Sequence, residues 1–200
     1  MSKYSLIKID RKRPSDFYKE YEENYKRLLE SILERNPGIT QDYFNTLAKS
    51  PNIGYLVFTG KVSGREQRVE LFAHSQIQSE RNKNISPELH EYLLQSYSVQ
   101  VDEPNYQDGY VNSTNDELYF RDSLKMKDVW YRDVDSESKL VENFFRRYRN
   151  EEIQGEIQLF TTFSPCLSCN NKLLNFIKEH DDISIEVSYL RVYNGFKRRK

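Results

Sequence analysis

The chain has 200 residues and a formal net charge of −1 at pH 7, a length that suits one domain with an extension and is short for two. Although 30% of the residues are charged, the 15 tyrosines and 11 phenylalanines exclude the disordered class. A net charge near zero excludes a global attraction to nucleic acid, so any nucleic-acid site must be a local basic patch.

The sequence carries no signal for a membrane. No apolar run reaches membrane-spanning length, and the first residues, MSKYSLIKIDRKRP, contain no signal-peptide core. Two cysteines three positions apart do not make the disulfide framework of a secreted protein. We therefore expect a cytoplasmic protein without membrane contact, and export by a dedicated secretion system would leave the same sequence pattern.

The first 50 residues are predicted to form a helical extension. Apolar residues recur at helical spacing over 15–36, and Pro37 with Gly38 ends this run. A short second helix is expected from Thr40. The tyrosines of this region could stack on bases, but their helical spacing favours the buried face of an amphipathic helix.

The main domain is predicted to span residues 51–200 and to open with a β-hairpin. Two strand-like segments, 54–62 and 67–77, are joined by the short turn SGRE. An insertion follows at about 78–131. Its expected elements are a helix, a long surface loop and a short strand, at 86–98, 99–116 and 117–120.

The last seventy residues alternate between helical and strand patterns. Helices are predicted over 135–149 and 166–180, and strands over 156–163, bounded by Gly155, and over 183–193. Strand, helix and strand with short connections indicate a right-handed crossover between parallel strands. The fold class is therefore α/β, a three-layer α/β/α sandwich behind the N-terminal extension.

The two cysteines, Cys166 and Cys169, follow Pro165 at the start of a predicted helix. The helix dipole and its free N–H groups lower thiol pKa there, which suits both redox exchange and metal binding. Redox exchange fits less well, because no proline follows Pro165 to pack against a disulfide. A closed structural zinc site would need two more ligands, and the three histidines form no second paired motif. An open zinc site with a third protein ligand is the remaining interpretation.

The segment SPCLSC matches the second half of the zinc-deaminase pattern, H-x-E followed by P-C-x-x-C. The first half should open the preceding helix, which begins with Asp135, Ser136 and Glu137. Pro165 lies 28 positions after Glu137, which leaves room for one helix, a turn and one strand. Asp, Ser and Glu are also ordinary residues for a helix start, so only the joint pattern carries weight.

The segments DSESKL, GEIQLFTTFSPCLSCNNKLLNFIKEH and ISIEVSY resemble the deaminase domains of bacterial polymorphic toxins, in the cytidine-deaminase-like superfamily. The hairpin segment ELFAHSQI is also similar to the opening strands of the toxin-deaminase family. The resemblance covers roughly residues 54–193 and leaves residues 1–50 outside. It implies a cytidine-deaminase-like fold and the zinc-dependent hydrolytic deamination of a nucleobase.

Carried over to this sequence, the resemblance implies that Glu137 is the general acid/base and that Zn²⁺ is the cofactor. Asp135 stands where the superfamily usually has histidine, so the site would be more negative and its water harder to ionise. His74 is the rival third ligand, and we assign it to the pocket wall instead. The implied zinc ligands are Asp135, Cys166 and Cys169, and the implied substrate pocket contains His74, Ser75, Ser164 and Pro165.

The expected reaction converts cytosine in DNA or RNA, with adenine as the less favoured alternative substrate, in a bacterial toxin or other conflict-system effector. An immunity or partner protein would fit such a role. The added segments suit a macromolecular substrate and contain aromatic candidates for base stacking, although packing is the favoured role for each of them. These aromatic residues are Tyr106, Tyr110, Tyr119, Phe120 and Trp130. Arg146, Arg147 and Arg149 could contact phosphates or form the solvated face of their helix.

An alternative hypothesis is a catalytically silent deaminase-fold protein that acts as a binding or assembly module. In that case the departure at Asp135 would mark lost activity. The two hypotheses differ in zinc content and in whether one coordination position stays open to water.

Overall fold

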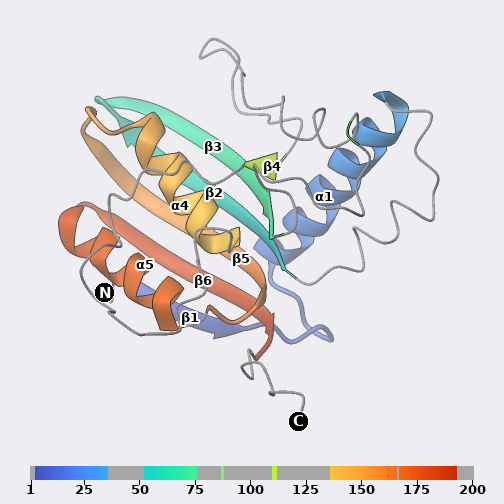
Figure 1. The fold of residues 1–200 in the computed structure, drawn as a ribbon. Coiled ribbons are helices and arrows are strands. Elements are labelled where there is room, and N and C mark those ends of the chain that lie inside the picture. The colour runs from blue at the N-terminus through green and yellow to red at the C-terminus, as the bar shows by residue number, and fades with distance from the viewer. Residues whose placement is uncertain are drawn as a thin grey trace.

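The computed structural model describes residues 3–35, 52–75, 110–111, 136–165 and 167–192, together with residue 87. These residues form one mixed sheet in the order β1-β6-β5-β2-β3-β4 (Figure 1). The strands are β1 (Tyr4–Lys8), β2 (Ile53–Val62), β3 (Arg65–His74), β4 (Tyr110–Val111), β5 (Ile153–Phe163) and β6 (Ile183–Arg191). The helices of the described ranges are α1 (Asp16–Arg35), α4 (Ser136–Arg147) and α5 (Leu167–Glu179).

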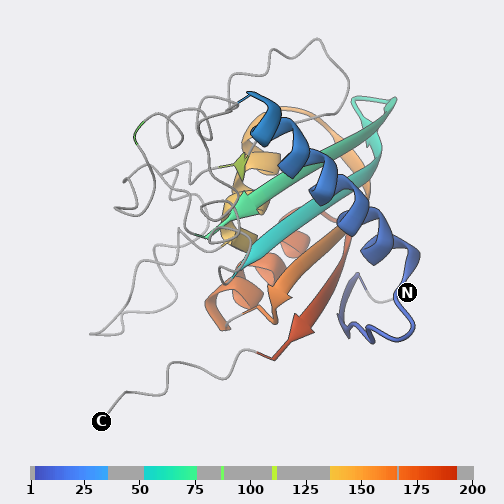
Figure 2. The same cartoon turned by 90° about the vertical axis from the view of Figure 1, so that its right-hand side faces the viewer.

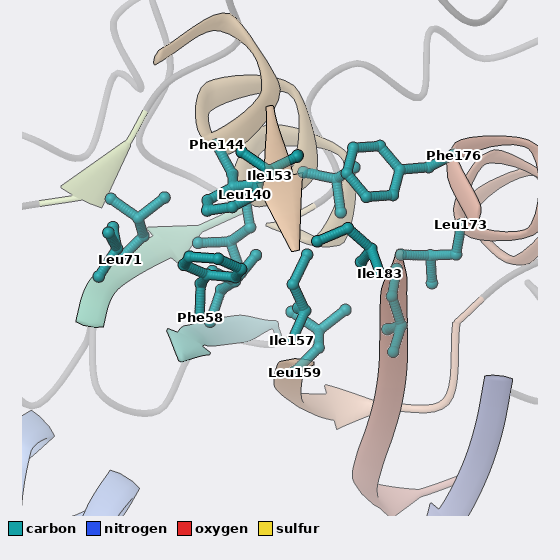
Figure 3. Packing of buried hydrophobic residues seen from close by; sticks show 14 of the residues in the cluster. Phe58, Leu71, Leu140, Phe144, Ile153, Ile157, Leu159, Leu173, Phe176 and Ile183 are labelled. Carbon is teal, nitrogen blue, oxygen red and sulfur yellow. The ribbon is translucent and has the colours of Figure 1, made fainter. Parts of the chain in front are cut away.

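The sheet is covered by helices on both faces, which confirms the predicted three-layer α/β/α sandwich. Figure 2 shows α1 crossing one face of the sheet, while α4 and α5 lie behind it on the other. Alternate residues of β2 show the same division. Leu56 and Phe58 join a core with α4 and α5, whereas Tyr55 and Val57 join a second core with α1. Figure 3 shows the first of these cores, with Phe144 of α4 and Phe176 of α5 directed onto the strands.

The predicted hairpin is confirmed, although β3 ends at His74 rather than at residue 77. Its two-residue turn consists of Ser63 and Gly64, with φ angles of 47° and 79°. Two consecutive residues with positive φ are typical of a type I′ turn, whose twist matches that of the flanking strands. This turn fixes the register in which Ile53 lies opposite His74 at the far end of the hairpin.

The predicted crossover is also confirmed, because β5 and β6 are parallel and α5 connects them. The sequence pattern predicted that Gly155 marks the start of this strand. This was wrong, because Gly155 lies inside β5 opposite Gly60. A Cβ atom on Gly155 would lie 2.4 Å from the carbonyl oxygen of Thr59. Here glycine permits a close approach between two strands and does not end one.

The N-terminal segment is helical over α1, as predicted, but it also contains a strand that the sequence pattern did not reveal. β1 pairs in parallel with β6 and extends the sheet. In addition, the surface loop predicted over 99–116 contains β4, which pairs in parallel with β3. The helix expected from Thr40 and the strand over 117–120 lie outside the described residues, as does the helix over 86–98 apart from helical residue 87.

No helix in the described ranges has both the length and the hydropathy that crossing a bilayer requires.

Candidate active site

Both predicted halves of the site start at one end of the sheet. The parallel strands β1, β5 and β6 end there, and the antiparallel strand β2 begins there. The N–H of Ser164 donates to the carbonyl of Arg191 at 2.7 Å, and the N–H of Ser75 donates to the carbonyl of Asn52 at 3.0 Å. We call this the C-terminal end of the sheet, and both α4 and α5 begin at it.

Glu137 lies in the first turn of α4 and is only 3% exposed. The side-chain amide of Asn52 donates to its two carboxylate oxygens, at 3.3 Å from Oε1 and 3.1 Å from Oε2. The hydroxyl of Thr161 lies 3.0 Å from Oε1, and that of Ser136 lies 3.1 Å from Oε2. The carboxylate is therefore buried but well supplied with donors, which fixes its orientation.

The hydroxyl of Thr161 can serve Glu137 in either charge state. It also lies 2.9 Å from the amide oxygen of Asn52 and 2.9 Å from the carbonyl of Phe163. A hydroxyl donates one proton and can accept others. It can donate to ionised Glu137, or accept from protonated Glu137 while donating to one of the other oxygens. Such an arrangement suits a carboxyl group that takes up and returns a proton.

The start of α4 rests directly on β2 because residue 54 has no side chain. A Cβ atom on Gly54 would lie 2.7 Å from Cδ1 of Leu140 and 3.1 Å from Cβ of Ser136. Real Cβ atoms do not make contacts this short without a shift of their neighbours. Gly54 thus determines how closely the helix start that carries Glu137 approaches the sheet.

Cys169 lies in the first turns of α5, where its thiol is buried. Its neighbour Asn170 accepts a hydrogen bond from the hydroxyl of Tyr4 at 2.6 Å. Burial raises the pKa of Tyr4 to about 12, and the negative charges of Cys169 and Glu137 contribute to this increase. The thiol and the carboxylate therefore lie in the same region, close enough for both to affect one hydroxyl.

The described part of the site fits a metal cation. Two acidic groups, Cys169 and Glu137, are buried near one another, and their ionised forms need compensating positive charge. Thiolate is a preferred zinc ligand. Within the described ranges no three His, Cys, Asp or Glu side chains come together. Asp135 and Cys166 lie outside those ranges, so the predicted zinc ligand set stays a prediction.

The four residues assigned to the substrate pocket all lie at the C-terminal end of the sheet. His74 is fully buried, and its carbonyl oxygen accepts a hydrogen bond from the ammonium group of Lys139 at 2.9 Å. Ser75 follows it and binds the main chain of Asn52, the residue that holds Glu137. Ser164 and Pro165 are half-buried between β5 and α5. Their role in binding a substrate stays a prediction.

The predicted nucleic-acid contacts lie elsewhere. Arg146, Arg147 and Arg149 are exposed at the end of α4 that is opposite Glu137. Ten residues of helix separate Glu137 from Arg147, or about 15 Å at the usual rise per residue. Among the aromatic candidates for base stacking, Tyr110 belongs to β4. Tyr106, Tyr119, Phe120 and Trp130 lie outside the described residues.

Two residues of the site have no counterpart in the sequence-based prediction. Asn52 precedes β2 and Thr161 lies in β5, and neither belongs to a recognisable motif. They meet Glu137 across sequence separations of 85 and 24 residues. A polar residue at a buried strand position was the one available signal for Thr161, which is fully buried.

This arrangement is the architecture of the deaminase class. It combines an α/β/α sandwich with a buried glutamate and a buried cysteine in the first turns of two adjacent helices. The family comparison agrees with this assignment. The Toxin-deaminase family model, described as the BURPS668_1122 family of deaminases, matches residues 39–191. This match covers well over half of the chain, so the chain belongs to the Toxin-deaminase family. No curated protein matches the chain by sequence.

Proposed function

We propose that the protein is a zinc-dependent hydrolase that deaminates a nucleobase, with cytosine to uracil as the favoured reaction, in DNA or RNA. One observation carries the proposal. Glu137 is buried at the start of α4, is held by Asn52 and Thr161, and shares its region with the buried thiol of Cys169. Family membership supports a deaminase and, through the family name, a toxin.

Cys169, Cys166 and Asp135 would hold the metal. When bound, zinc would act as a Lewis acid that makes water more acidic and therefore a better nucleophile. The carboxylate Asp135 would replace the neutral imidazole usual in the superfamily. Two thiolates and one carboxylate leave more negative charge around the cation, which reduces this effect. The positive ends of the α4 and α5 dipoles partly offset that charge, because both helices begin at the site.

Glu137 would move the protons of the reaction. Its carboxylate takes one proton from the attacking water, while oxygen bonds to the carbon that carries the amino group, C4 of cytosine. Glu137 delivers this proton to the ring nitrogen. It then takes the second proton from the hydroxyl group now bonded to that carbon and delivers it to the amino group as the C–N bond breaks, so that ammonia leaves and a carbonyl group remains. Asn52 holds the carboxylate in one orientation throughout, and Thr161 can exchange its donor and acceptor roles as the charge of Glu137 changes.

The substitution Glu137→Gln tests this function. We expect purified protein to convert cytosine to uracil in at least one of three substrates: cytidine, single-stranded DNA or single-stranded RNA. Glu137→Gln should lower the rate by about 10²- to 10⁴-fold, as is typical for loss of a general acid/base. Mass spectrometry of the digested substrate measures the product. The matched control is Glu156→Gln, which changes an exposed glutamate of β5 and should leave the rate unchanged.

Sequencing of cellular DNA and RNA after expression of the wild type and of Glu137→Gln extends the test to the natural substrate. Conversion that depends on Glu137 supports the enzyme. A folded protein loaded with zinc that converts no nucleoside, nucleotide or polynucleotide would contradict it and favour the silent binding module.

A further inference from the structure

The described N-terminal segment brings a cluster of positive charge to the C-terminal end of the sheet. Residues 8–13, which we call the basic turn, read KIDRKR and begin with the last residue of β1. The side chains of Lys8, Arg11, Lys12 and Arg13 are exposed. Arg191, exposed at the end of β6, adds a fifth cation nearby. The family match begins at residue 39, so family membership does not account for this segment.

Hydrogen bonds connect the basic turn to the candidate active site. The N–H of Ile9 donates to the carbonyl of Tyr189 at 2.8 Å, and two residues later the carbonyl of Arg191 accepts from Ser164 at 2.7 Å. β1 lies two strands from β5 in the sheet, which corresponds to about 10 Å. In Figure 1 the blue segment after β1 lies at the end of the sheet where β6 finishes.

Hydrogen bonds fix the main chain of the basic turn, and its basic side chains are exposed. The N–H of Arg13 donates to the carbonyl of Asp10 at 2.9 Å, and the N–H of Lys12 donates to the Asp10 carboxylate at 2.9 Å. Asp10 is thus engaged by main-chain N–H groups. Arg11 contacts the hydroxyl of Tyr18, near Glu22. Within the described residues, Lys8, Lys12 and Arg13 form no ion pair, and their side chains are exposed to solvent.

We propose that the basic turn binds the phosphate backbone of a single-stranded polynucleotide whose base enters the site at Glu137. This proposal rests on the proposed function and makes it more specific, because it names a single strand as the substrate and the segment that binds its backbone. Five cations on one end of the sheet exceed what one phosphate can pair with, and they match the repeated charge of a strand. A local patch of this kind is also what a chain of net charge −1 requires.

Binding can be tested without turnover in the Glu137→Gln background. Fluorescence anisotropy would follow full-length protein titrated into labelled 15-nucleotide single-stranded DNA and RNA of mixed sequence, at several salt concentrations. The test variant carries Lys8→Gln, Lys12→Gln and Arg13→Gln, which remove charge but keep side-chain length. Arg11 is left in place because it contacts Tyr18. The control variant carries Lys26→Gln, Arg27→Gln and Lys178→Gln, an equal loss of charge on exposed helical positions away from the site.

We expect the basic-turn variant to bind at least one of the two strands roughly tenfold more weakly or worse. The slope of log affinity against log salt should fall by about 2, as expected when three contacts to a single strand are lost. The control variant should bind like the parent. The proposal is overturned if the basic-turn variant binds like the parent, if the control loses as much affinity, or if the parent binds neither strand. Turn-dependent binding of poly-glutamate without binding of oligonucleotide would also overturn it, in favour of an acidic protein partner.

The same variants separate this proposal from the proposed function. With Glu137 restored, the basic-turn variant should convert free cytidine at the parental rate, if the parent converts it, and convert the oligonucleotide more slowly. Equal conversion of the oligonucleotide by both proteins would reject the basic turn and leave the deaminase intact. Turn-dependent binding without any base conversion would reject the deaminase and leave the polynucleotide site intact.

Discussion

The side-chain amide of Asn52 donates hydrogen bonds to both carboxylate oxygens of Glu137, at 3.3 and 3.1 Å, across 85 residues of sequence. Asn52 directly precedes β2, whereas Glu137 lies in the first turn of α4. The contact therefore ties the start of the central hairpin to the start of the helix that carries the proposed general acid/base. Because the amide donates to the carboxylate, this contact also favours the charged form of Glu137.

Asn52→Ala should slow deamination and shift its pH dependence. Hydrogen bonds to charged groups contribute about 1.5–3 kcal/mol, so we expect a loss of roughly 10- to 100-fold in kcat/KM near neutral pH. The acid limb of the pH–rate profile should move to higher pH, because ionised Glu137 loses donors. Rates measured from pH 4 to 9 would show both effects. The control Asn143→Ala removes an amide that binds the carbonyl of Lys139 within α4.

A change in rate without a shift of the acid limb would indicate that Asn52 has only a structural role. The same conclusion would follow if Asn143→Ala shifted the profile equally.

Gly54→Ala should reduce activity more than its effect on stability would predict. The new methyl group would lie 2.7 Å from Cδ1 of Leu140 and 3.1 Å from Cβ of Ser136. Overpacking of this kind costs about 1–3 kcal/mol, and the relief available is a shift of the α4 start, with Glu137, away from β2. Urea unfolding and kcat measured together would detect it. Gly64→Ala is the matched control, because the φ angle of +79° strains alanine while its surroundings are open. An unchanged kcat in Gly54→Ala would show that catalysis does not depend on how closely the start of α4 approaches β2.

Zinc content should identify the third ligand. We expect about one zinc per chain by elemental analysis, and its loss in Cys169→Ser and Asp135→Ala. His74→Gln should retain the metal, because we assign this fully buried side chain to the pocket wall. Zinc retained in Asp135→Ala but lost in His74→Gln would reverse this assignment. The readout is independent of activity, so it also applies to a silent protein.

Local patterns predicted the parts of the fold that rest on local rules. Hydrophobic periodicity placed α1, α4, α5 and the strands around them, and the turn at Ser63 and Gly64 followed from the short SGRE link. β1 was missed because a five-residue strand at a sheet edge shows no distinctive alternation. Gly155 was misread because the contact that requires glycine there, with Thr59, comes from another strand.

The candidate site shows the same limit. Glu137 and Cys169 were predicted from a motif with fixed spacing, and both lie buried near helix starts. Asn52 and Thr161 could not be predicted, because their role arises only when β2 and β5 pair and bring them to Glu137. Residues that orient a catalytic group from other strands have no fixed spacing from it in the sequence, so a motif cannot reveal them.

Alkaline pH should destabilise the protein through the tyrosines between α1 and the sheet. Burial raises the pKa of Tyr18 to about 12 and raises the pKa of Tyr21 and Tyr55 above their usual value of 10. The unfolded chain therefore loses these protons first as pH increases. The free energy of unfolding should be insensitive to them below pH 10 and fall between pH 10 and 12. Urea unfolding at pH 8, 9.5, 10.5 and 11.5 measures this.

Tyr55→Phe should make the alkaline loss of stability less steep, because it removes one of the groups that titrate. A free energy of unfolding that stays constant up to pH 11.5 would contradict this electrostatic account.

Deletion of residues 1–36 should leave a chain that cannot fold, although the family match begins only at residue 39. α1 covers the face of the sheet formed by Tyr55, Val57, Phe72 and Phe160, none of which is more than 2% exposed. Without α1, these apolar side chains would face water, and we expect insoluble protein. A milder test is Leu28→Ala at a fully buried position of α1, with an expected cost of about 2–5 kcal/mol in urea unfolding. The exposed position Arg27→Ala on the same helix should cost less than about 0.5 kcal/mol. A soluble, cooperatively unfolding deletion variant would show that the N-terminal segment is a separable extension after all.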